Sequence, residues 1–400
     1  MKLSSLLDRF SEPETLKMAK LGRELRAQGI DVIDLSLGEP DFNAPDHIKD
    51  SAKKAIDENY SHYTPVAGYP DLREAVCKKL KRDNGLDYKP QNILISTGAK
   101  QSIANTMFAL LDEGEEILIP TPYWVSYSEI ARMARGKVTF IQAPASNNFK
   151  ITPDQLEAAI TENTKLFIFS SPCNPSGSVY SKDELEGLAK VFEKHPQVYI
   201  LSDEIYEYIN YVKQDTDLRD SIAGFENIKD RVIIINGLSK GFALTGWRIG
   251  YIAANETIVK ACEKIQGQFT SGTNAVAQRA SITALENDLT PTYEMVKQFK
   301  KRKEKVMELL KELPLLNCTE PEGAFYIFPE VKNYFGKKAG DTAINNASDL
   351  CMYLLNEAHV STVAGDAFGA PDFLRIAFAN SMENIEEGFK RIKIALDKVQ

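Results

Sequence analysis

Short runs of apolar, mostly β-branched residues recur between residues 92 and 254 of the chain. Seven of them have the length and composition of buried strands: 92–96, 116–120, 137–142, 165–170, 198–202, 231–236 and 249–254. Amphipathic stretches that favour helices lie between several of these runs, at 100–111, 125–135, 153–162 and 182–195. Continuously apolar strands that alternate with helices are typical of a mostly parallel sheet covered on both faces. The pattern therefore predicts an α/β fold.

The pattern changes from about residue 286, where long charged stretches predict helices at 286–312, 347–358 and 382–398. Two short strand-like runs, FYIFP and LRIAF, accompany these helices. A chain of 400 residues is also too long for one typical domain. We therefore predict a large domain over residues 46–285 and a smaller α+β domain over 286–400, joined by the N-terminal segment 1–45.

Composition and charge narrow the class of protein. Hydrophobic residues make up 43% of the chain and charged residues 26%, which are ordinary values for a globular protein with a large core. The net charge of −8 argues against nucleic acid and anionic membranes as partners, and no apolar run is long enough to span a bilayer. The five cysteines are scattered, and the chain starts without the apolar core of a signal peptide, so we expect a reduced, cytoplasmic setting.

Three enzyme classes lack their motifs here. The four histidines have no metal-ligand spacing, so no metal site is expected. A nucleotide-dependent oxidoreductase would need a G-x-G-x-x-G turn after an early strand, and an NTPase would need a P-loop lysine. Neither motif occurs in the chain.

The residues that follow the predicted strands are the candidates for chemistry, because ligands bind at the carboxyl ends of strands in an open parallel sheet. The sixth run is followed by GLSKGFALTGWRIGY, in which Lys240 lies in a glycine-rich loop and Arg248 comes eight residues later. A lysine held there against a bound ring would be desolvated. Its amine pKa would then fall, as Schiff-base chemistry requires. A lone loop lysine is more often simply solvated, so the functional interpretation depends on the neighbouring motifs.

Other strand ends carry polar groups that have both a structural and a chemical interpretation. Asp203 follows the fifth run, with Tyr206 three residues later; a buried acid there could pair with a protonated ring nitrogen or could cap a helix. Asn174 could be a turn former or an amide donor. Gly98 precedes a predicted helix whose free N–H groups could hold a phosphate. Trp124 offers a face for a flat ring, although tryptophan is usually a core residue.

In their order along the chain, these motifs resemble the class I and II aminotransferases of pyridoxal 5′-phosphate (PLP) fold type I, and within them the bacterial aspartate aminotransferase branch. The resemblance extends from LSLGEPDF near the start to FLRIAFANSMENIEEG near the end. GLSKGFALTGWRIGY matches the family's signature around its PLP lysine. The resemblance implies a large domain with a mostly parallel, seven-stranded sheet flanked by helices, and a smaller α+β domain.

The resemblance also implies roles for individual residues. Lys240 would hold PLP as a Schiff base and move the substrate proton. The residues implied to contact the ring are Trp124, Asn174, Asp203 and Tyr206, and those implied to hold the phosphate are Ala99, Lys100, Arg248 and Tyr63 from a partner subunit. Many relatives have a serine that touches the phosphate where this chain has Gly237. The role of that hydroxyl either passes to Ser239 or is absent.

The implied reaction is a ping-pong transfer of an amino group from an L-amino acid, first of all L-aspartate, to 2-oxoglutarate. Arg375 would clamp the substrate α-carboxylate near the Gly38 backbone, with Trp124 and Asn174 also in contact, and Lys100 would meet the distal carboxylate. Other donors stay open, namely prephenate with glutamate, aromatic amino acids, alanine and kynurenine, as does a PLP lyase on the same fold. Tyr63 and the loop at 266–278 imply a homodimer with shared sites. Arg375 alone could equally be a surface strand residue.

Overall fold

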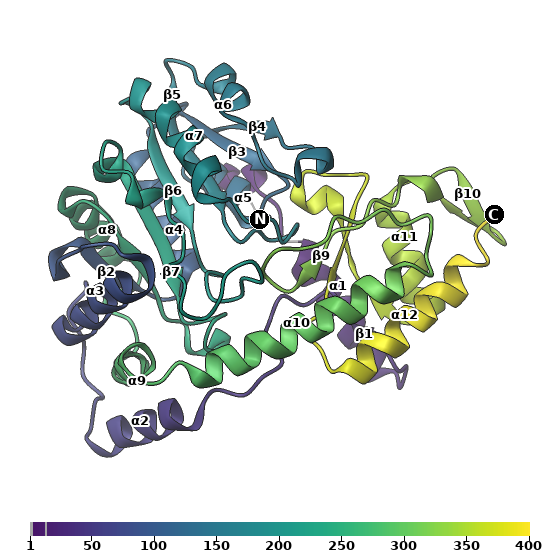
Figure 1. The fold of residues 1–400 in the computed structure, drawn as a ribbon, viewed down its shortest axis with the longest axis horizontal. Coiled ribbons are helices and arrows are strands. Elements are labelled where there is room, and N and C mark those ends of the chain that lie inside the picture. The colour runs from purple at the N-terminus through teal and green to yellow at the C-terminus, as the bar shows by residue number, and fades with distance from the viewer. Residues whose placement is uncertain (1–2, 13) are drawn as a thin grey trace.

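The computed structural model describes residues 3–12 and 14–400 and has two packed parts that lie side by side along its longest axis (Figure 1). The larger part contains one seven-stranded sheet in the order β2-β8-β7-β6-β5-β3-β4. Its strands are β2 (Ile93–Ser96), β3 (Glu116–Thr121), β4 (Lys137–Gln142), β5 (Thr164–Ser170), β6 (Tyr199–Asp203), β7 (Val232–Gly237) and β8 (Gly250–Ala253). All pairs are parallel except those that β8 makes with β2 and β7. The predicted mostly parallel sheet is confirmed.

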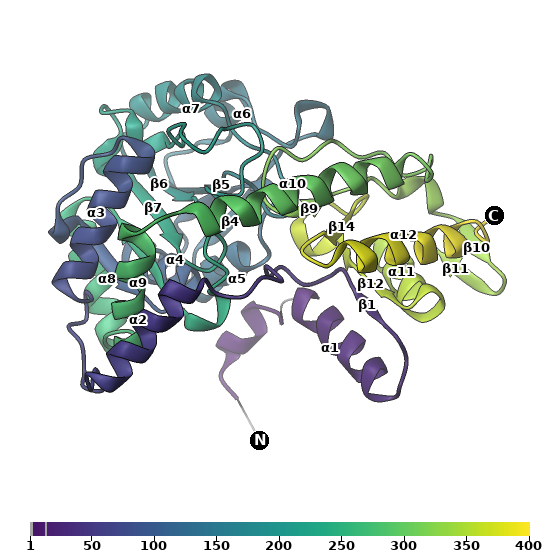
Figure 2. The same cartoon turned by 60° about the horizontal axis from the view of Figure 1, so that its bottom comes forward.

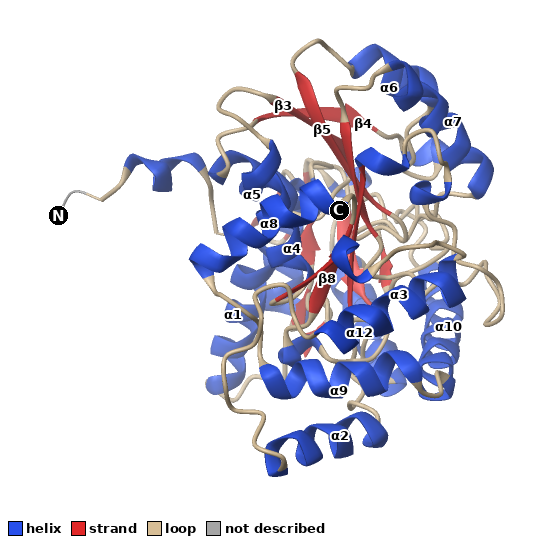
Figure 3. Cartoon of the chain, turned by 90° about the vertical axis from the view of Figure 1, so that its left-hand side faces the viewer, coloured by secondary structure: helices blue, strands red, loops and turns tan. Residues whose placement is uncertain are grey.

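Helices cover both faces of this sheet (Figure 3). One face packs against α4 (Ala99–Leu110), α5 (Ser126–Met133) and α8 (Glu256–Phe269). The other packs against α2 (Asp46–Asp57), α3 (Pro70–Asn84), α6 (Pro153–Ala159), α7 (Lys182–Lys194) and α9 (Ala275–Glu286). In β7, Ile233 and Ile235 enter the first core, whereas Val232 and Ile234 enter the second. Because both faces are buried, the strands are apolar at every position and not at alternate ones.

The smaller part is built on a three-stranded antiparallel sheet of β13 (Val363–Ala364), β14 (Leu374–Ala377) and β9 (Tyr326–Ile327). Its helices are α10 (Thr290–Leu310), α11 (Ala347–Tyr353) and α12 (Met382–Leu396), and it carries the hairpin β10 (Lys337–Ala339) and β11 (Thr342–Ile344). Figure 2 shows α10 running from the larger part into the smaller one.

The N-terminal segment packs with this smaller part. It contains α1 (Glu14–Ala27) and β1 (Ile33–Asp34), and β1 pairs in parallel with β12 (Val360–Ser361). Met18, Ile33 and Leu35 share one hydrophobic core with C-terminal residues from Met295 to Val399. This shared core supports the proposed boundaries at residues 45 and 285, which stay a prediction.

Two predicted helices in the tail differ from the structure. The helix predicted at 286–312 is α10, which begins only at Thr290, with Pro291 in its first turn, and ends at Leu310, whereas Glu286 is the last residue of α9. The stretch 347–358 is α-helical only to Tyr353 and continues as a π-helix from Leu354 to Ala358. Among the described residues, no helix is long and apolar enough to cross a membrane.

Candidate active site

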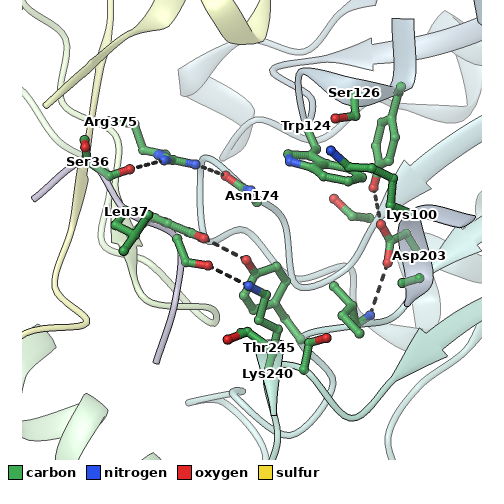
Figure 4. Close-up of a pocket in the computed structure, with 18 of the residues that line it drawn as sticks. Ser36, Leu37, Lys100, Trp124, Ser126, Asn174, Asp203, Lys240, Thr245 and Arg375 are labelled. Atoms are coloured by element: carbon green, nitrogen blue, oxygen red, sulfur yellow. Dashed lines mark hydrogen bonds between the residues drawn. The ribbon is translucent and has the colours of Figure 1, made fainter. Parts of the chain in front are cut away.

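A pocket of about 290 Å³ opens between the two parts, at the carboxyl ends of the parallel strands (Figure 4). Strands β5, β6 and β14, the loop after β7, the start of α4 and the segment after β1 all contribute to its wall. The residues that sequence analysis singled out line this pocket together, apart from Tyr63: Gly38, Ala99, Lys100, Trp124, Asn174, Asp203, Tyr206, Ser239, Lys240, Arg248 and Arg375. Tyr63 lies in the loop between α2 and α3 and is 99% exposed.

Lys240 lies in the loop that follows β7, and its amine points into the pocket (Figure 4). Its Nζ donates a hydrogen bond to the Gly38 carbonyl at 2.6 Å. Burial lowers the pKa of Lys240 to about 8, because removing the amine from water disfavours its charged form. The side chain is therefore not a freely solvated loop lysine, and a fraction of its amine is neutral near neutral pH.

Asp203 is the last residue of β6, and its carboxylate is buried at the pocket floor. The Tyr127 hydroxyl donates to its Oδ2 at 2.6 Å, and the Ile205 amide donates to its Oδ1 at 3.2 Å. Burial raises the pKa of Asp203 to about 6, and no described lysine or arginine forms an ion pair with it. The residues that follow form turns and not a helix, so the helix-cap interpretation is wrong. A buried carboxylate without a cationic partner is suited to receive one from a ligand.

The start of α4 forms a cradle for an anion. Within the described chain, the amides of Ala99 and Lys100 have no hydrogen-bond acceptor. Gly98 precedes them with φ of 82°, and a Cβ there would collide with the Arg248 guanidinium. Arg248 also donates from Nη1 to the Thr245 carbonyl at 2.8 Å. Free amides at a helix N-terminus and a guanidinium beside them together favour a phosphate-sized anion.

Lys100 and Trp124 lie side by side at the pocket wall (Figure 4). The Lys100 ammonium lies 4.9 Å from the centre of the Trp124 ring. Partial burial, and next the charge on Arg248, lower the pKa of Lys100. Ser239 is buried in the pocket wall, next to Lys240.

Arg375 lies in β14 and is only 2% exposed, so its interpretation as a surface strand residue is wrong. Its Nη1 donates to Asn174 Oδ1 at 2.9 Å and its Nη2 donates to the Ser36 carbonyl at 2.6 Å (Figure 4). Its Nε is buried without a partner in the described chain. Burial lowers the pKa of Arg375, because removing the guanidinium from water disfavours its charged form. A buried guanidinium of this kind is a binding site for a carboxylate.

Several further residues of the pocket are not among those predicted from the sequence. Tyr127 comes from α5 and bonds to Asp203, and the Tyr326 hydroxyl from β9 lies 2.7 Å from that of Tyr206. Ser36 contributes the carbonyl that Arg375 binds. Ser36 lies in the quoted stretch LSLGEPDF and Tyr326 in FYIFP, but neither stretch indicates these contacts, since each residue meets its partner only when distant segments fold together.

Comparison with known proteins gives matches over the whole chain. Residues 30–392 match the family described as aminotransferase class I and II. The aspartate/prephenate aminotransferase of Nitrosomonas europaea is 41% identical, covering 98% of this chain and 99% of its own. The bifunctional aspartate aminotransferase and glutamate/aspartate-prephenate aminotransferase of Petunia hybrida is also 41% identical, covering 99% of this chain and 83% of its own.

Solved structures agree with these sequence matches. The aspartate aminotransferase from Rhizobium meliloti superimposes with a TM-score of 0.95 at 38% identity, over 100% of both chains. The aspartate aminotransferase from Thermus thermophilus with maleate has a TM-score of 0.92 at 33% identity, over 99% of this chain and 100% of the other.

Proposed function

Since the chain belongs to the class I and II aminotransferases, we propose that this transaminase uses PLP, takes L-aspartate as its first amino donor and passes the amino group to 2-oxoglutarate. The convergence of three buried groups in one pocket carries this proposal: the Lys240 amine, the Asp203 carboxylate and the Arg375 guanidinium. The names of the relatives support aspartate as donor.

The pocket residues fit PLP. The unpaired amides of Ala99 and Lys100, together with Arg248, would hold its phosphate. Asp203 would hold a proton on the ring nitrogen, because a cation beside this carboxylate compensates its burial. The ring would lie against Trp124. When bound, PLP supplies an electron sink that stabilises negative charge at the substrate Cα.

Tyr206 and Asn174 would contact the ring oxygen. Tyr206 is buried in the pocket, and its hydroxyl is paired with that of Tyr326. The Asn174 side-chain oxygen accepts from Arg375, which leaves its amide group free to donate. Position 237 is a glycine and has no hydroxyl. The Ser239 hydroxyl, which lies in the pocket wall next to Lys240, would bind the phosphate in its place.

The chain's own groups would also handle the substrate. Arg375 would orient the α-carboxylate near the Gly38 backbone, and Lys100 at the pocket wall would attract the distal carboxylate. With a pKa of about 8, the Lys240 amine is partly neutral near neutral pH, so it can accept the Cα proton and return it. Substrate binding and proton transfer therefore depend on the relative positions of Arg375, Lys100 and Lys240.

The first test is the visible spectrum of the purified, PLP-loaded protein before and after L-aspartate is added without an oxo acid. We expect a visible band that is lost on addition, with formation of oxaloacetate, and a Lys240→Ala variant that lacks this response. A band that L-aspartate leaves unchanged would overturn the donor, and the absence of any band would overturn the cofactor.

A second candidate is amino transfer to prephenate, because the names of two relatives include prephenate as well as aspartate. Supplying prephenate to the aspartate-treated enzyme should restore the visible band if this activity is present. If 2-oxoglutarate restores the band and prephenate does not, prephenate is not an acceptor.

We also propose a homodimer in which Tyr63 reaches the partner's phosphate site. Within the stretch 266–278, only residues 270–274 form a loop, between α8 and α9. The 99% exposure of Tyr63 and the 66% exposure of Phe269, the last residue of α8, support a protein contact there. Mixing Tyr63→Phe and Lys240→Ala chains should give activity above that of either variant alone, while sedimentation at the monomer mass would contradict the proposal. Location in the cytoplasm stays a prediction, supported by five free cysteines.

A further inference from the structure

The turn that follows β6 carries functional side chains on one side and a buried polar cluster on the other. Asp203 and Tyr206 line the pocket. Glu207 does not line it; it is 4% exposed and points instead toward α3 and β7. The same few residues of backbone therefore belong both to the pocket and to the cluster behind it.

The Glu207 carboxylate binds groups from two other elements. Its Oε1 accepts from Asn236 Nδ2 at 2.7 Å and forms an ion pair with Lys79 Nζ at 2.5 Å. Its Oε2 accepts from Asn84 Nδ2 at 3.2 Å. Lys79 and Asn84 come from α3, whereas Asn236 is the residue before the end of β7. One carboxylate thus joins the turn to a helix and to a neighbouring strand.

The cluster contains few unsatisfied groups. Lys79 is 1% exposed and donates to Asn84 Oδ1 at 2.8 Å. Asp83 accepts from the Tyr208 hydroxyl at 2.5 Å and from Arg82 through two bonds of 2.6 and 2.9 Å. Burying such ion pairs adds little net stability compared with apolar residues of the same size, because their desolvation offsets the attraction. What the cluster supplies is a fixed geometry.

That geometry bears on the pocket because Asn236 lies four residues before Lys240 in the chain. Its Oδ1 also accepts from the Gly237 amide at 2.7 Å, where the Lys240 loop begins. We propose that Glu207 is a positioning residue that holds the end of β6, with Asp203, and the turn after it, with Tyr206, in register with the loop bearing Lys240. Glu207 touches neither substrate nor cofactor. The kinetic consequence of this inference rests on the proposed function.

Two double variants test the inference. Lys79→Met with Glu207→Gln removes both buried charges but keeps a side-chain oxygen for Asn236. Lys79→Met with Glu207→Leu removes the same charges and the oxygen. The two proteins have the same net charge and nearly the same side-chain volume, so they differ mainly in whether position 207 can form hydrogen bonds with Asn236 and Asn84. Lys150→Met is the control, since it breaks a partly buried ion pair with Glu184 elsewhere in the larger part.

The first readout uses the cofactor-free protein. In hydrogen exchange followed by mass spectrometry, peptides covering residues 204–211 and 237–244 should exchange faster in the leucine variant than in the glutamine variant. The control should leave both peptides unchanged. Equal exchange in the two double variants would overturn the inference, whatever the enzyme's activity is.

The second readout is steady-state kinetics with the PLP-loaded proteins. We expect kcat of the leucine variant to be at least about tenfold below that of the glutamine variant, with a similar KM for the donor, because misplaced reacting groups slow the chemical step. Equal kcat values in the two double variants would contradict the positioning role. A lower kcat that is explained entirely by a lower unfolding temperature would leave Glu207 with a structural role only. If the wild-type protein does not transaminate at all, the proposed function fails, and the exchange experiment still decides the positioning role.

Discussion

Replacing Glu204 by glutamine should make the protein's stability less sensitive to pH. Glu204 follows Asp203 directly and is 2% exposed. The hydroxyls of Ser202 and Ser221 donate to its Oε1 at 2.9 and 2.6 Å, but its Oε2 is buried without a partner in the described chain. Burial raises the pKa of Glu204 from 4.5 to about 7.

The direction of the effect follows from proton binding. Between pH 4.5 and about 7 the folded protein keeps a proton on Glu204 that the unfolded chain has lost, so the free energy of unfolding falls as the pH rises through this window. A pKa change of this size corresponds to about 3 kcal/mol once both states are ionised. Glutamine does not titrate, so the variant should escape this loss.

The measurement is urea unfolding of the cofactor-free protein at about pH 5 and about pH 8, at one protein concentration because assembly also affects stability. The change in unfolding free energy from about pH 5 to about pH 8 should be more favourable in Glu204→Gln than in the wild type, by about 1–3 kcal/mol. The raised pKa of Asp203 also makes stability depend on pH, but this effect is the same in both proteins and cancels in the comparison. Glu226→Gln, at an exposed carboxylate, is the matched control and should show almost no such gain. An identical pH dependence in wild type and Glu204→Gln would refute the reasoning.

Four further predictions concern the pocket. Tyr127→Phe removes the hydroxyl that donates to Asp203, so kcat should fall about tenfold and PLP should dissociate more readily on ultrafiltration; unchanged retention would speak against the role of this bond. Arg375→Lys should lower kcat/KM for aspartate by about 100-fold or more, since a lysine cannot form the two-bonded fork, and a loss below about threefold would contradict the clamp. Lys100→Ala should raise the KM for aspartate more than that for an uncharged donor, and equal effects would remove Lys100 from substrate recognition. The rate at which cofactor-free protein captures PLP should rise with pH, pass its half-maximum near pH 8 and level off only above it, as the Lys240 amine loses its proton; a flat profile from pH 6 to 9 would disagree with the lowered pKa.

The sheet could be predicted from the chain because its strands are buried on both faces. The run 231–236 became β7 over Val232–Gly237, and its whole length is buried. The predicted helix at 286–312 is present as α10 (Thr290–Leu310), but it begins four residues later than predicted, because long charged stretches show where helices lie better than where they begin. The Thr290–Pro291 pair was the local signal for the start of α10, since proline is favoured in the first turn of a helix.

By itself, the sequence determined the α/β class, the strand ends that carry Asp203 and Lys240, and the resemblance to the aminotransferases. These features are local, because apolar runs, turn residues and signature motifs are readable within a few positions. Only the tertiary structure decided that Tyr127 meets Asp203 across 76 positions and that Arg375 meets the Ser36 carbonyl across 339. It also decided the lowered pKa of Lys240 and the raised pKa of Asp203. Burial sets both shifts, and burial depends on which distant segments close over a side chain.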